Sequence, residues 1–139
     1  MLTFRFPIVL AAALFAASLP VVAEGKVPLA EETHINDQLI AGAAGDILRN
    51  TCPTISARML TVLSKLNALE GYARKQGYTE EEVKAFLKDK SEKARIKAAA
   101  KAYLAKAGAV EGDTESYCAA GRDEIDKGTL LGSLLRSTE

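Results

Sequence analysis

The stretch that decides the fold is THINDQLIAGAAGDILRNTC, residues 33–52. Its apolar residues recur at three- and four-residue spacing, which is typical of an amphipathic helix: Ile35, Leu39, Ile40, Ala43, Ala44, Ile47 and Leu48. Thr33 is a suitable N-cap. The helix is expected to end near Cys52, because a residue that precedes a proline is disfavoured in the helical region. This stretch predicts a helical fold whose first long helix ends at a cysteine.

Cys52 and Cys118 are the only cysteines of the chain. An even pair in an exported protein predicts one disulfide; two free or intermolecularly paired thiols are the alternative. In the chain-entropy model, closing a loop of about 67 residues stabilises the folded state by roughly 4 kcal/mol. We expect the bridge to hold the C-terminal helices against the first two helices.

The remaining sequence also favours helices. The apolar residues from Ile55 to Gln76 keep a 3.6-residue period, which predicts a helix that ends before Gly77. Thr79 to Glu82 form a capping box for the next helix, which stops near Asp89 or continues beyond it. Further helices are expected over 92–107, from Asp113 to Lys127, and over 130–135. No segment alternates with period two, so strands are not expected. The prediction is an all-α fold, a compact bundle of about five helices stapled by Cys52–Cys118.

The first 23 residues have the pattern of a secretion signal. Arg5 precedes the apolar run Pro7–Leu19, and Val21, Val22 and Ala23 place small residues before Glu24. We expect cleavage after Ala23 and a periplasmic protein; the alternative, an uncleaved anchor, would need a run of about 20 apolar residues. Residues 24–32 are predicted to form a flexible arm, and residues 33–139 a single helical domain without a transmembrane segment.

The net charge argues against nucleic acid as a partner. Without Arg5, 17 basic residues face 18 acidic residues, and nucleic-acid binding needs a clear cationic excess. Lys93, Arg95, Lys97 and Lys101 nevertheless form a basic stripe. It either complements the acidic segment from Glu111 to Glu139 within the fold or docks on an acidic protein or anionic lipid.

No motif for catalysis, metal binding or cofactor binding is recognisable. His34, the only histidine, lies near Glu31, Glu32 and Asp37, but zinc needs several nitrogen or sulfur ligands. Asp123, Glu124 and Asp126 are the candidate carboxylates for a hydrolase or lyase, although solvated ion pairs along a helix are the preferred explanation. We therefore predict no catalytic, cofactor-binding or metal-binding residue.

Several runs of residues resemble a known family: 34–37 (HIND), 52–58 (CPTISAR), 111–113 (EGD), 115–118 (ESYC) and 121–125 (GRDEI). They are similar to an uncharacterised family of small secreted bacterial proteins with two cysteines, defined only as a domain of unknown function. The resemblance implies an exported helical protein without an assigned activity. Members are often encoded among the genes of the respiratory NADH:quinone oxidoreductase, which implies an accessory role at that membrane complex.

The predicted function is therefore a non-catalytic periplasmic binding or accessory protein with a protein partner, associated with a membrane respiratory complex. A small periplasmic chaperone or inhibitor is the first alternative. A carboxylate-based hydrolase or lyase is the second.

Overall fold

The computed structural model describes residues 25–139, so the predicted signal peptide lies outside the described residues. Within this range six α-helices, one 3-10 helix and two short strands follow one another along the chain: η1 (Leu29–Glu31), α1 (Thr33–Thr51), β1 (Ile55–Ala57), α2 (Met59–Lys75), α3 (Glu80–Lys88), α4 (Lys90–Lys106), α5 (Thr114–Lys127), α6 (Leu130–Ser133) and β2 (Leu135–Ser137). The predicted all-α fold is confirmed, with the strands as a minor addition.

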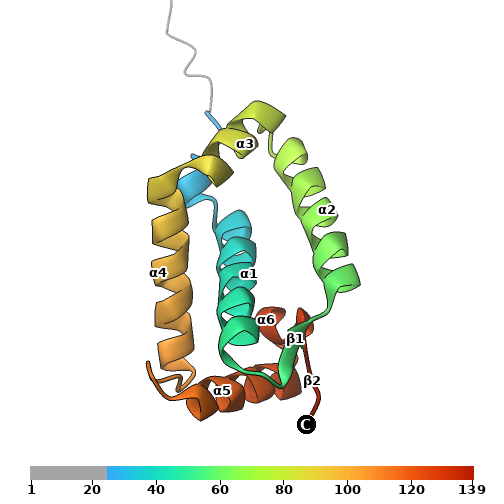
Figure 1. The fold of residues 1–139 in the computed structure, drawn as a ribbon. Coiled ribbons are helices and arrows are strands. Elements are labelled where there is room, and N and C mark those ends of the chain that lie inside the picture. Colours follow the sequence, from blue (N-terminus) through green and yellow to red (C-terminus); the bar gives the residue numbers. More distant parts are fainter. Residues whose placement is uncertain (1–24) are drawn as a thin grey trace, which may run out of the picture.

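The first helix, α1, lies at the centre. Figure 1 shows α4 and α2 on its two sides, α3 joining them at one end, and α5 crossing below α1 at the other end. Contacts of α1 are most extensive with α4, and α5 and α6 also pack against it, whereas α2 contacts it sparsely. The protein therefore consists of a packed unit of α1, α4, α5 and α6, and an arch formed by α2 and α3.

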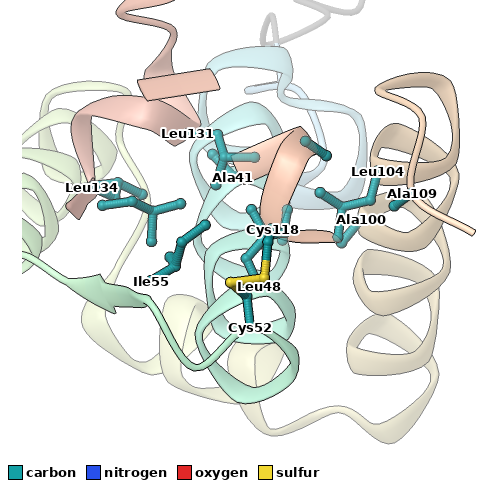
Figure 2. Close-up of a cluster of buried hydrophobic side chains, with 13 residues drawn as sticks. Ala41, Leu48, Cys52, Ile55, Ala100, Leu104, Ala109, Cys118, Leu131 and Leu134 are labelled. Carbon is teal, nitrogen blue, oxygen red and sulfur yellow. A yellow bond between two sulfur atoms is a disulfide. The ribbon is translucent and has the colours of Figure 1, made fainter. Parts of the chain in front are cut away.

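The main core lies inside the packed unit. Figure 2 shows Leu48, Leu104 and Leu131 converging around α1, and all three are fully buried. A second, smaller core joins the N-terminal end of α1 to α2 through Ile35, Ala73 and Tyr78. No side chain of α3 is buried, and only Ala73 of α2 is.

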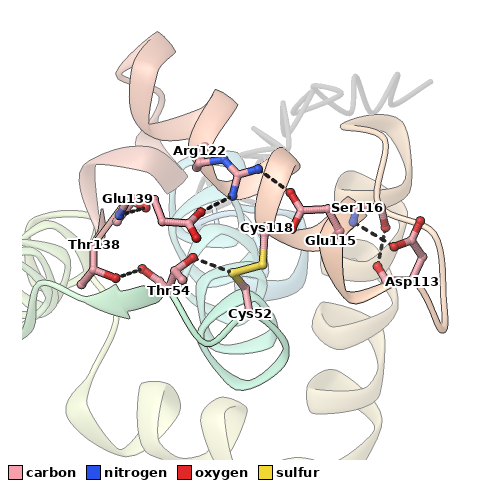
Figure 3. The surroundings of a disulfide bond; sticks show 10 residues. Cys52, Thr54, Asp113, Glu115, Ser116, Cys118, Arg122, Thr138 and Glu139 are labelled. Atoms are coloured by element: carbon pink, nitrogen blue, oxygen red, sulfur yellow. Dashed lines mark hydrogen bonds and ion pairs between the residues drawn. A yellow bond between two sulfur atoms is a disulfide. The ribbon is translucent and has the colours of Figure 1, made fainter.

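The predicted disulfide between Cys52 and Cys118 is present, and it connects the C-cap of α1 to the middle of α5. Both cysteines are buried in the main core. Figure 3 shows its surroundings, in which the Thr54 hydroxyl lies 3.3 Å from the Cys52 sulfur. The bridge thus fixes one end of α1 to the C-terminal helices, as expected.

Local signals placed several helix ends correctly. Thr79 and Glu82 form the predicted capping box, and the Asp113 side chain accepts a hydrogen bond from the Ser116 N–H. Gly128 ends α5 in the left-handed region with a φ of 62°. Asp89 ends α3 and caps α4, so the predicted helix does break there.

Other expectations were wrong. The N-cap of α1 is Glu32 rather than Thr33, since the Glu32 carboxylate accepts a hydrogen bond of 2.6 Å from the Ile35 N–H. Residues 55–57, expected to start a helix, form β1, which pairs antiparallel with β2 in the register Ile55 to Ser137. The last helix correspondingly ends at Ser133. Strands were missed because three residues are too short to show a period of two.

The segment 24–32 was predicted to be a flexible arm. From Lys26 onwards it contacts the arch: the Lys26 ammonium donates to the Gly77 carbonyl at 2.9 Å, and the Tyr78 hydroxyl donates to the Val27 carbonyl. Lys26 also forms an ion pair with Glu82 at 2.6 Å. This segment therefore ties the N-terminal end of the domain to α3.

Close packing of α6 on α5 requires a glycine. A Cβ atom at Gly132 would overlap the carbonyl oxygen of Glu124, which belongs to rigid helix backbone. At Gly42, which the sequence also marked for close approach, nothing lies within 4 Å of such an atom, and at Gly45 the nearest is Leu131 Cδ1 at 3.5 Å. Of these three glycines, only Gly132 on α6 is required by close backbone packing.

We predict that Gly132→Ala lowers the free energy of unfolding by about 3 kcal/mol or prevents folding, because α6 must move off α5. Gly42→Ala, the matched control in an exposed helix interior, is expected to raise stability by about 0.5–1 kcal/mol. Urea unfolding followed by circular dichroism measures both. Equal stability of the two variants would contradict the packing of α6.

The disulfide gives a second prediction. Replacing both cysteines by alanine is expected to lower the free energy of unfolding by about 2–4 kcal/mol, because the unfolded chain loses a long closed loop. Mass spectrometry of non-reduced peptides must show the cross-linked pair, and reduction of the wild type must reproduce most of the loss. An unchanged unfolding midpoint would show that packing alone holds α1 on α5.

Candidate functional site

The arch leaves an apolar hollow of about 370 Å³ between α2, α3 and the N-terminal half of α1. From α2 it is lined by Leu66, Leu69 and Ala73, which share one helix face. From α3 the apolar lining residues are Val83, Phe86 and Leu87. The lining of the hollow is therefore mainly apolar.

A second hollow of about 290 Å³ lies between α1, α3 and α4. It shares Leu39, Phe86 and Leu87 with the first hollow. The two hollows are therefore neighbours with these three side chains as their common wall, and together we call them the groove.

The floor of the groove is a face of α1. Leu39, Ala43 and Ile47 follow one another at four-residue spacing and are only partly buried. The other face of α1 carries the fully buried Ala44 and Leu48. The periodicity that predicted one amphipathic helix thus covers two apolar faces: one is fully buried in the main core, and the other is only partly covered at the edges of the two cores.

The walls expose further apolar side chains. On α2, Leu66 is 52% exposed, and on α3 Leu87 is 45% exposed. Met59 and Leu63 of α2 are also more than half exposed but lie outside the lining of the groove. Leu60 is the most exposed at 85%, but it lines a different and more polar hollow with His34 and Gln38. Exposed large apolar side chains gathered in this way are typical of interaction surfaces.

Charged residues border the groove unevenly. Beside α2 and α3, Arg74 pairs with Glu70, and Lys84 pairs with Glu80 at 2.5 Å. Such exposed pairs contribute little to stability, but they neutralise this end. The α4 side is lined by Asp46, Glu92, Lys93 and Lys97. The two carboxylates pair with Arg49 and Arg95, whereas no ion pair within residues 25–139 involves the two lysines.

The predicted basic stripe is therefore divided by the structure. Lys93, Lys97 and Lys101 are exposed along α4. Arg95 instead pairs with Glu92 at 2.7 Å and donates to the buried Asn36 side chain at 2.5 Å. Arg95 consequently joins α4 to α1, and the three lysines are the members of the stripe that form no ion pair with residues 25–139.

The acidic C-terminal segment does not cover these lysines. Its ion pairs, as far as the described chain shows, are internal: Arg122 binds Glu115 at 2.5 Å and Glu139 at 3.0 Å, and Lys127 binds Asp123 at 2.5 Å. No ion pair of residues 25–139 joins this segment to the stripe, so internal complementation is not observed there.

Among the candidate carboxylates, Glu124 has a structural role. It is 6% exposed and accepts hydrogen bonds from the Tyr103 hydroxyl, at 2.8 Å, and from the Thr129 hydroxyl, which also caps α6. Burial and the bond to Glu124 raise the pKa of Tyr103. Glu124 thus joins α4, α5 and α6, while Asp123 pairs with Lys127 and Asp126 is exposed.

His34 packs against an aromatic ring. Its ring centroid lies 4.4 Å from that of Tyr72 at an interplanar angle of 52°. Within residues 25–139 no three side chains of histidine, cysteine, aspartate or glutamate lie close enough together to hold a metal ion. The observed role of His34 is therefore a contact between α1 and α2.

Glu32 fastens the arch to α1. Its carboxylate caps α1 and also accepts a hydrogen bond of 2.9 Å from the Tyr72 hydroxyl of α2. Partial burial raises the pKa of Glu32, but the hydrogen bonds from Ile35 and Tyr72 outweigh burial, and the pKa lies below its usual value. The ionised form is therefore the one that the folded structure favours.

The helices of residues 25–139 include none with the length and apolar character that crossing a membrane requires.

Comparison with known proteins gives one match. The model of a family described as a family of unknown function (DUF5333) matches residues 27–136. No curated protein and no solved structure matches the chain. The match covers every run of residues that carried the resemblance seen in the sequence.

A pH dependence follows from Glu32. Because its pKa is lowered in the folded state, its contribution to stability is present above the unfolded pKa of about 4.3 and is lost as the pH falls through the folded pKa. Glu32→Gln is expected to lose less thermal stability than the wild type between about pH 7 and about pH 3. The matched control is Glu31→Gln, at an exposed neighbour. If both variants follow the wild type, Glu32 does not anchor the arch.

Proposed function

The chain belongs to the DUF5333 family, a family of unknown function, and we propose that it is a non-catalytic periplasmic binding protein that docks on a protein of a membrane complex. The family provides no activity from which to start. The proposal therefore depends on what the surface of this chain offers to a partner.

The observation that carries the proposal is the set of exposed lysines on α4. Lys93, Lys97 and Lys101 make no ion pair with the described residues, and two of them border the apolar groove. Unpaired positive charge attracts an acidic surface and speeds its association. The neighbouring apolar side chains then provide area whose burial stabilises the complex.

The proposed compartment is supported by the disulfide, because bridges of this kind persist in oxidising environments such as the periplasm. The resemblance noted in the sequence adds a candidate partner, the respiratory NADH:quinone oxidoreductase. On this proposal the protein attaches to the periplasmic side of that complex as an accessory subunit.

A small periplasmic chaperone is the second candidate, favoured by the open apolar groove. The two differ in selectivity, since a chaperone binds many unfolded chains whereas an accessory protein binds one folded partner. The carboxylates give no comparable support to a hydrolase, because Glu124 is engaged in structural hydrogen bonds.

We predict that the tagged protein co-purifies with a membrane complex, and that Lys97→Glu combined with Lys101→Glu releases it. Reversing two exposed charges replaces attraction by repulsion across the interface and is expected to weaken binding about tenfold or more. Raising the salt concentration is expected to weaken wild-type binding in the same direction. Quantitative mass spectrometry of the purified membranes measures the release.

The matched control is Lys75→Glu combined with Lys88→Glu, which changes the charge equally at exposed sites outside α4. It is expected to stay bound, and both variants are expected to keep their helical circular dichroism. Membrane capture of the α4 variant at the wild-type level would contradict the proposal. Capture of many unrelated unfolded proteins instead would favour the chaperone.

A further inference from the structure

We infer that the groove binds an amphipathic α-helix of the partner protein, with carboxylates along the flank that faces α4. This inference rests on the proposed function and adds the site and the chemical class of its ligand. It follows from the length of the groove, from its depth and from the position of its charges.

The floor fits two turns of a helix. From Leu39 to Ile47 the chain advances eight residues, which correspond to about 12 Å along α1. An amphipathic helix presents apolar anchors at i, i+3 or i+4, and i+7 over a similar length, the usual spacing for a helix bound in a groove. Ala43, in the middle of the floor, is small enough to let a second helix approach closely.

The depth favours a helix over a flat lipid surface. Leu39 and Ile47 lie on the central helix, and Figure 1 shows that α4 and α2 lie on its two sides and α3 joins them. A planar bilayer surface would meet the exposed side chains of the walls, such as Leu87, before it reached the partly buried floor. An inserted helix instead contacts floor and walls together.

The charges define the flank of the ligand. Lys93 and Lys97 lie one turn apart on the same side of the groove, with no ion pair inside the described chain. Carboxylates three or four residues apart on a bound helix would face both lysines at once. The opposite rim is already neutralised by the pairs of Arg74 and Lys84.

Charge also argues against a second copy of this chain as the ligand. The helix with the largest set of exposed apolar side chains, α2, carries three basic residues and a basic N-cap against the single acidic residue Glu70. Placing α2 of another molecule in the groove would bring these charges toward Lys93 and Lys97. The ligand is therefore an acidic helix of a different protein.

The test uses two designed peptides of about 18 residues, or roughly five turns. Both carry leucines at i, i+3, i+4 and i+7; one has two glutamates at i, i+4 beside the leucines, and its twin has lysines there. We expect the acidic peptide to bind about tenfold or more tightly than the twin. Amide NMR shifts are expected to change at Leu39, Ala43, Leu87 and Lys97.

Two matched variants locate the site. Leu87→Glu places a charge inside the groove and is expected to weaken binding of the acidic peptide about tenfold or more. Leu60→Glu is the same substitution at a more exposed leucine outside the groove, and it is expected to bind as the wild type does. Circular dichroism confirms that both variants are folded.

Three outcomes would overturn the inference: equal binding of the two peptides, shifts confined to another face, or equal effects of the two leucine variants. Stronger binding to phosphatidylglycerol vesicles than to the acidic peptide would assign the groove to lipid. Concentration-dependent dimerisation that is lost in Leu87→Glu would assign it to a second copy of the chain. If the peptide binds in the groove but the protein does not co-purify with membranes, only the proposed function fails. The opposite result is also distinguishable. If the Lys97→Glu, Lys101→Glu variant no longer co-purifies with membranes but the acidic peptide does not bind in the groove, the proposed function stands and the inference is refuted.

Discussion

The Cys52–Cys118 bridge joins the end of α1 to α5, and the arrangement of the other helices depends on which face of α1 this connection buries. Because the bridge holds α5 at the C-terminal end of α1, α1 packs Ala44 and Leu48 into the main core beside Leu104 and Leu131. The second apolar face of α1, with Leu39, Ala43 and Ile47, is only partly covered at the edges of the two cores and lines the hollow toward α3 and α4.

That second face determines the shape of the rest of the molecule. The arch of α2 and α3 runs over it but buries little of it, since Ala73 is the only buried residue in the two helices. Polar contacts attach the arch at its ends, notably Glu32 to Tyr72 and Lys26 to Glu82. A small domain thus keeps an apolar groove open, bordered by Lys93 and Lys97, which form no ion pair with residues 25–139. The proposed preference for an acidic ligand rests on these two lysines.

Sequence reasoning succeeded where the signal lies within a few residues. The Thr79–Glu82 box, the Asp113 cap and the Gly128 end each depend on neighbours along one helix turn. It failed where partners are distant: β1 pairs with β2 some 80 residues later, and Arg95 turns toward Asn36 of α1. The groove was missed for a related reason, because periodicity identifies apolar faces without showing which of them find a partner. That several leucines of α2 stay exposed can be recognised only from the folded structure, in which α1 packs mainly against α4.

Native-state hydrogen exchange of the backbone amides tests the central claim most directly, namely that a disulfide-anchored unit carries a loosely attached arch. The account predicts that amides in the middle of α1, α4 and α5 exchange only through global unfolding, while those of α2 and α3 exchange through local opening at a lower free energy. Reduction of the disulfide is expected to lower the protection of α1 and α5 together. Equal protection of α2 and α1 in the oxidised protein would contradict the division into unit and arch.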